Sequence, residues 1–68
     1  MKKTFRILKL IPDEANSRKK WKVEYTTEHI VAAFEYIGTS ALQRCGQYEL
    51  QQEQEDGIIF ILAKINVL

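Results

Sequence analysis

The chain has 68 residues and a formal net charge of +1, with 46% hydrophobic and 28% charged residues. This length suits one domain near the lower size limit, and the composition excludes a disordered tail. A single cysteine excludes an internal disulfide and a four-ligand zinc site, and no apolar run reaches the ~18 residues of a membrane span. We therefore expect one cytoplasmic domain over residues 1–68, in a reducing compartment.

Two strands are expected in the first third of the chain. Residues 4–11 are rich in β-branched and aromatic side chains and end at Pro12, which cannot continue a ladder. Both faces of this strand are apolar, which is typical of a central strand. After a polar turn cluster at 13–18, Trp21, Val23 and Tyr25 alternate with charged residues. The alternation predicts a second strand, buried on one face and antiparallel to the first.

A helix is expected next, over residues 27–45. The threonines at 26 and 27 are candidate N-caps, and Gly46 has the position of a left-handed C-cap. The segment 38–40, which begins with Gly38, is a weak point that could split the helix into two short pieces. Apolar residues that recur every three or four positions define one apolar face of this helix, formed by Ile30, Ala33, Phe34, Ile37 and Ala41.

The segment 47–54 could be a helix extension or a strand. Its residues are good helix formers, but the break at Gly46, the alternation of Tyr48 and Leu50 with polar residues, and Asp56-Gly57 ahead favour a strand. The biased run at 51–55 is expected to be a solvated edge strand. A two-residue Asp56-Gly57 turn predicts the pairs Glu53–Phe60, Gln52–Ile61, Gln51–Leu62, Leu50–Ala63, Glu49–Lys64 and Tyr48–Ile65.

These elements predict an α+β domain of order β-β-α-β-β, in which one helix packs on one face of an antiparallel sheet. The last strand, from residue 58 onward, is apolar on both faces, and a single helix leaves the other sheet face uncovered. An exposed apolar patch usually marks an interaction surface. We expect a homodimer or a partner protein to contact Ile58, Phe60, Leu62, Leu8 and Leu10. The alternative is a curled sheet shielded by the loop at 12–19.

The near-neutral total charge hides a strong division. Residues 1–22 have a net charge of +6 and residues 23–68 a net charge of −5. The first hairpin is thus a basic ribbon that could contact phosphates or an acidic partner. Alternatives are a solvated loop, or contact with the acidic half of another copy. The expected contact residues are Arg18, Lys19, Lys20, Lys22 and Lys3.

No catalytic constellation is recognisable. His29, at the start of the helix, is expected to be a surface or capping residue, and Cys45 a small core residue at the helix end. The two are expected at opposite ends of one helix, which places them too far apart in space for a Cys-His pair. The glycines form no phosphate loop and the acidic residues have no metal-ligand spacing. We expect no enzyme activity, no cofactor and no metal.

The overall layout resembles the very small phage-encoded inhibitors of bacterial defence, the anti-CRISPR proteins. The similarity lies in the Met1-Lys2 start that leads into a strand, the Ser17-Arg18-Lys19 loop, Val23-Glu24 before a helix with Ala32-Ala33, and the Asp56-Gly57 hairpin. It implies a protein that docks on a surveillance complex, and it carries over no functional residue. A protein-interaction module is the first expectation, and a nucleic-acid-binding protein is the second.

Overall fold

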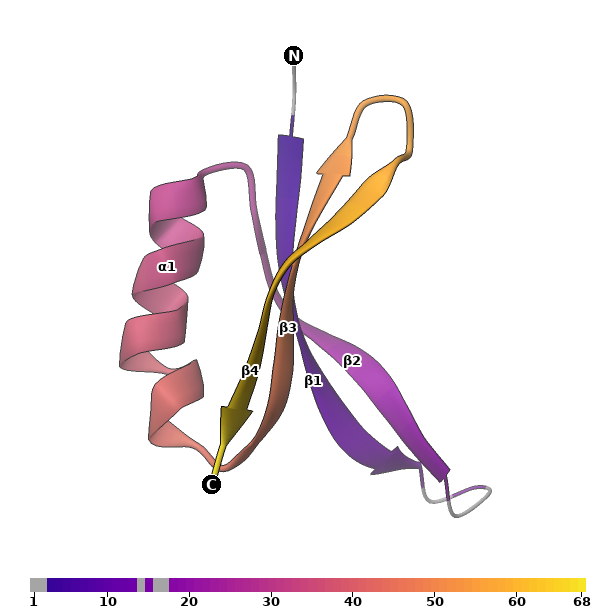
Figure 1. Ribbon diagram of the computed structural model, residues 1–68, viewed down its shortest axis with the longest axis vertical. Coiled ribbons are helices and arrows are strands. Elements are labelled where there is room, and N and C mark those ends of the chain that lie inside the picture. Colours follow the sequence, from indigo (N-terminus) through magenta and orange to yellow (C-terminus); the bar gives the residue numbers. More distant parts are fainter. Residues whose placement is uncertain (1–2, 14, 16–17) are drawn as a thin grey trace.

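The computed structural model describes residues 3–13, 15 and 18–68. Its elements, in chain order, are β1 (Lys3–Asp13), β2 (Arg18–Thr27), α1 (Ile30–Thr39), the 3-10 turn η1 (Ala41–Gln43), β3 (Gly46–Gln54) and β4 (Ile59–Val67) (Figure 1). The predicted α+β fold and element order are confirmed, and so is a strand over 47–54. The turn predicted at 13–18 lies partly outside the described residues.

The four strands form one antiparallel sheet of order β2-β1-β3-β4. β1 is central, as its two apolar faces predict, and it pairs with both β2 and β3. Its pairing with β3 ends at Lys9 opposite Tyr48, and beyond this point the two hairpins diverge (Figure 1). The run at 51–55 is therefore not an edge strand, because β3 lies between β1 and β4. The edges are β2 and β4.

A small core fills the space between the sheet and α1. Burial of a large apolar side chain is worth about 1.5–3 kcal/mol, so these few residues supply most of the drive to fold. The helix covers one face of the sheet, and the other face has no helix on it (Figure 1). The buried hydrophobic residues are Phe5, Ile7, Ala33, Ala41, Tyr48 and Leu50.

The helix is shorter than the predicted 27–45. It ends at Thr39, directly after Gly38, and the chain continues through η1 into extended backbone at Arg44. The weak point at 38–40 thus does divide the segment, and Gly46 begins β3 instead of capping a helix. Because of this early end Cys45 is exposed, and its predicted place in the core is wrong.

The helix also begins later and packs differently from the prediction. The N-cap is His29, whose backbone N–H donates to Thr27 Oγ1 at 3.1 Å, so neither threonine is the cap. Phe34, expected on the buried face, is 58% exposed. Tyr36 contacts the sheet as well, because its ring stacks on Tyr25 with 4.6 Å between centroids.

A β-bulge divides the faces of β2. Ile7 pairs with Tyr25 and Leu8 with Val23, so Glu24 is the extra residue. Successive residues of a regular strand alternate between faces, and the bulge reverses the order. Tyr25 therefore lies on the helix side, whereas Val23 is half-exposed on the open side. The predicted single buried face of Trp21, Val23 and Tyr25 is wrong for this reason.

The β3–β4 hairpin contains two irregularities that cancel. Gln54 N–H donates to Ile58 C=O at 2.9 Å, and Gly57, between these two residues, has φ +86°, so the loop has three residues instead of two. The longer loop shifts every pair near the tip by one residue. An extra residue on β4, Leu62, then restores the register.

The predicted pairs nearest the tip are accordingly wrong and the distant ones are confirmed. The observed tip pairs are Glu53–Ile59, Gln52–Phe60 and Gln51–Ile61, and the confirmed pairs are Leu50–Ala63, Glu49–Lys64 and Tyr48–Ile65.

Two glycine substitutions should have opposite effects on stability. Gly57→Ala forces a side chain into the left-handed region and should cost about 1 kcal/mol. Gly38→Ala lies in a helix with nothing within 4 Å of the new Cβ and should stabilise by about 0.5–1 kcal/mol. Thermal unfolding followed by circular dichroism measures both. Equal Tm values for the two variants would contradict this assignment of the hairpin loop.

Candidate protein-interaction surface

Five consecutive large apolar side chains at the start of β4 are exposed. Their exposed fractions are 45–54%. β4 is an edge strand, so its outer side also has no neighbouring strand within the sheet. We call this segment the β4 edge, and it consists of Ile58, Ile59, Phe60, Ile61 and Leu62.

The β4 edge presents apolar groups on both sheet faces. Phe60 pairs with Gln52, and Gln52 also pairs with the core residue Phe5, so Phe60 lies on the helix side. Ile59 and Ile61 lie on the open side. These two isoleucines were not among the predicted contact residues, although the unbroken apolar run from 58 to 62 is a sequence signal for them.

The predicted grouping of Leu8 and Leu10 with the β4 residues is wrong. Leu8 and Leu10 lie on the open side of β1, where they pair with Val23 and Trp21. The strand order inserts β3 between this hairpin and β4. On the open side β3 presents only polar groups, at Gln47, Glu49, Gln51 and Glu53, so the apolar surface is divided in two.

The predicted basic contact residues also separate. Arg18, Lys19, Lys20 and Lys22 all lie exposed on β2. Lys3 pairs with Gln54, next to the β3–β4 loop, at the other end of the 11-residue β1. At about 3.3 Å per residue, this is roughly 30 Å from Arg18. The structure therefore assembles four of the five residues and leaves Lys3 apart.

A cation that was not predicted joins this group. Lys9 lies directly opposite Lys22 on the neighbouring strand, and Lys20 lies two residues along the same face. Like charges directly opposite in a sheet are destabilising. The Lys9 ammonium lies 5.4 Å from the centroid of the Tyr48 ring. Among the described residues, no carboxylate forms an ion pair with any of these three lysines.

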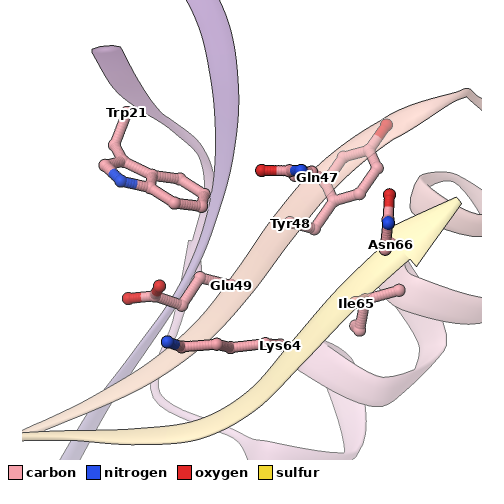
Figure 2. Close-up of a pocket in the computed structure, with 7 residues that line it drawn as sticks. All are labelled: Trp21, Gln47, Tyr48, Glu49, Lys64, Ile65 and Asn66. Atoms are coloured by element: carbon pink, nitrogen blue, oxygen red, sulfur yellow. The ribbon is translucent and has the colours of Figure 1, made fainter. Parts of the chain in front are cut away.

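A shallow pocket of about 310 Å³ opens where the two hairpins diverge. Figure 2 shows the Trp21 indole and the side chains of Glu49 and Lys64 pointing into the same space. Glu49 is buried, and its Oε1 accepts a hydrogen bond from Gln51 Nε2 at 2.7 Å. The lining contains no histidine, cysteine or hydroxyl nucleophile apart from the buried Tyr48.

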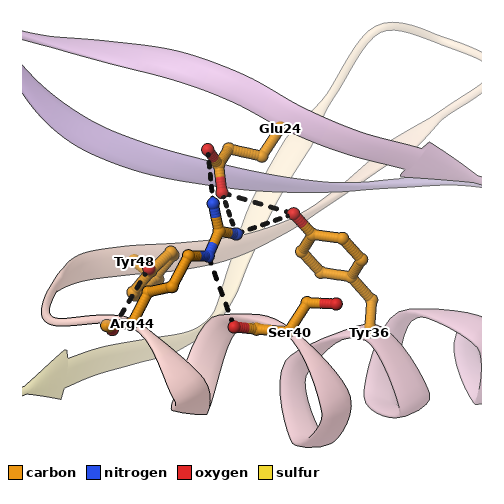
Figure 3. A network of polar contacts seen from close by, with 5 residues as sticks. All are labelled: Glu24, Tyr36, Ser40, Arg44 and Tyr48. Atoms are coloured by element: carbon orange, nitrogen blue, oxygen red, sulfur yellow. Dashed lines mark hydrogen bonds and ion pairs between the residues drawn. The ribbon is translucent and has the colours of Figure 1, made fainter.

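Arg44 connects the end of the helical segment to β2. Its guanidinium forms an ion pair with Glu24 at 2.6 Å, donates to Tyr36 Oη at 3.0 Å and donates to the Ser40 carbonyl at 3.4 Å (Figure 3). Tyr48 Oη in turn donates to the Arg44 carbonyl. The hydrogen bond with Glu24, followed by that with Tyr36, raises the pKa of Arg44.

Other kinds of site have little support in the described part of the chain. No group of three His, Cys, Asp or Glu residues is placed to hold a metal ion there. His29 precedes α1 and Cys45 follows η1, and both are exposed. Among the described residues no helix has the length and apolar character to cross a membrane.

Arg44→Lys should lower the Tm more than Arg6→Lys does. Lysine has no planar guanidinium group, so its single ammonium cannot replace the contacts of Arg44 with Glu24, Tyr36 and Ser40. Arg6 provides the matched control, because its surface ion pair with Glu53 needs a single contact. Thermal unfolding by circular dichroism makes the comparison. An equal loss of Tm in the two variants would show that the Arg44 link does not hold the helix to β2.

Comparisons of the sequence with protein-family models and with curated proteins, and of the structure with solved structures, found no match.

Proposed function

We propose that this chain is a non-enzymatic protein-interaction module that binds a protein through the β4 edge. The observation that carries the proposal is the run of five half-exposed apolar residues on an edge strand. An extended partner segment that adds to such an edge forms main-chain hydrogen bonds and places alternate side chains against both faces. The inhibitor role implied by the layout resemblance would act in this way, by docking on a larger protein.

The energetics of the β4 edge support binding. Complete burial of five half-exposed large apolar side chains would contribute roughly 4–7 kcal/mol, at about 1.5–3 kcal/mol per side chain. Association itself costs about 4–15 kcal/mol, so the apolar contact needs the main-chain hydrogen bonds of an added strand to give a stable complex. The proposed partner is therefore an extended segment and not a flat surface.

The two sheet edges differ in a way that selects β4. Edge strands are commonly protected from pairing by charged residues, lysine above all. β2 carries Lys19, Lys20 and Lys22 within its first five residues. The β4 edge carries no charged residue, and the first cation on β4 is Lys64. Only one of the two edges is thus open to a further strand.

Phe60→Glu should abolish partner binding, whereas Phe34→Glu should preserve it. Both substitutions replace a half-exposed phenylalanine, one on the β4 edge and the other on the outer surface of α1. The measurement is affinity capture from the cells that encode the chain, followed by hydrogen exchange of the purified complex. We expect protected amides in Ile59–Val67 of the wild type. Protection confined to other elements, or equal capture by both variants, would refute the role of β4.

A second function is favoured by the Lys9–Lys22 pair. Three lysines on one face without described carboxylate partners provide a site for an anionic ligand, and the phosphates of a nucleic acid satisfy it. The three lysines lie on the helix side of the β1–β2 hairpin, on the opposite face from Glu49 and Glu53 of β3. This nucleic-acid contact uses the opposite edge from β4, so the two functions are separable.

Replacing Lys9, Lys20 and Lys22 with glutamine should remove nucleic-acid binding that depends on salt. The affinity of a labelled oligonucleotide is measured by fluorescence anisotropy at several salt concentrations. The slope of the logarithm of the affinity against the logarithm of the salt concentration should decrease by about 1 for each phosphate contact removed. Lys64→Gln, on the far edge, is the control and should change little. Undetectable binding by the wild type at low salt would eliminate this second function.

A further inference from the structure

The apolar residues of the β4 edge are complementary to themselves. In an antiparallel pair of identical strands centred on Phe60, Phe60 meets its own copy, Ile59 meets Ile61 and Ile58 meets Leu62. Centring the pair on Ile61 would instead place Phe60 opposite the bulge at Leu62. Centring it on Ile59 would place Ile61 opposite the β3–β4 loop. The register centred on Phe60 is thus the one that joins all five apolar residues of the edge.

We propose that the β4 edge pairs with the β4 edge of a second copy of this chain, in the register centred on Phe60. This inference rests on the proposed function and names its partner. The two-fold axis is perpendicular to the sheet, so the dimer has one continuous eight-stranded sheet with both α1 helices on the same face. Each copy covers the exposed groups of the other on both faces at once.

The alternative contact between copies is less favourable. Pairing β4 of one copy with β2 of the next would place the apolar residues of the β4 edge beside Lys19, Lys20 and Lys22. It would also be a head-to-tail contact, which forms a ring or an open filament and not a two-fold dimer. The β4–β4 contact is isologous and closes as a dimer. The bulge at Leu62 follows Ile61, so the backbone of Ile59–Ile61 is regular where the two strands would meet.

Solution mass is the first test. Light scattering after size exclusion should show the mass rise with concentration from that of the 8.0 kDa monomer to twice this value. The contact is small compared with interfaces of about 1,200–2,000 Å², so we expect dissociation in the micromolar range. Phe60→Glu should be monomeric at every concentration, and Phe34→Glu should dimerise like the wild type. Circular dichroism establishes that both variants are folded.

Disulfide trapping tests the register itself. With Cys45 replaced by serine, Phe60→Cys should form a cross-linked dimer under mild oxidation, because the two Cβ atoms lie directly opposite each other. Ile58→Cys in the same background is the matched control. Its copies would be four residues apart along the strand, roughly 13 Å, which is beyond disulfide reach. Equal or faster trapping of the Ile58→Cys variant would overturn the register.

The outcomes separate this inference from the proposed function. A wild-type chain that stays monomeric at all concentrations overturns self-pairing alone, and protection of β4 by a captured protein would then still support the module. A dimer that Phe60→Glu leaves intact overturns pairing through β4. A dimer that Phe60→Glu dissociates, together with the Phe60→Cys cross-link, confirms the inference.

Discussion

The packing of one ten-residue helix against β1 and its two neighbours in the sheet is the constraint on which this structure depends. Ile7, Tyr48 and Leu50 are its largest fully buried side chains, and all three lie on the central strands β1 and β3. The helix also contacts β2, where the Tyr36 ring stacks on Tyr25. A helix of this length cannot cover four strands, so β4 keeps half-exposed apolar residues at its tip.

Much of the fold could be predicted because local patterns agree with it. The antiparallel first hairpin, the helical segment and the Asp56-Gly57 turn region each have short-range signals, and the central place of β1 follows from its two apolar faces. The bulges at Glu24 and Leu62 could not be predicted. A bulge changes which residues of a strand face the helix. Whether it forms therefore depends on the position of α1, which no short stretch of sequence specifies.

The candidate site shows the same division. The apolar run at 58–62 and the basic run at 18–22 are visible in the sequence, and the structure leaves both exposed. The strand order, however, is not encoded in any local pattern. Placing β3 between β1 and β4 separates Leu8 and Leu10 from Phe60. The register of β1 with β2 brings Lys9 opposite Lys22 and leaves Lys3 at the other end of β1. Which residues act together is thus a property of topology.

The three-residue loop and the bulge at Leu62 make the tip of the β3–β4 hairpin independent of the half that contacts the core. The loop adds one residue at the tip and Leu62 absorbs it, so Ala63 and Ile65 meet the same partners that a two-residue turn without a bulge would give them. A chain that lost one loop residue and Leu62 together would keep the same side chains facing α1. Insertions and deletions near the tip could therefore accumulate over evolution and remodel the outer edge while the core stays unchanged.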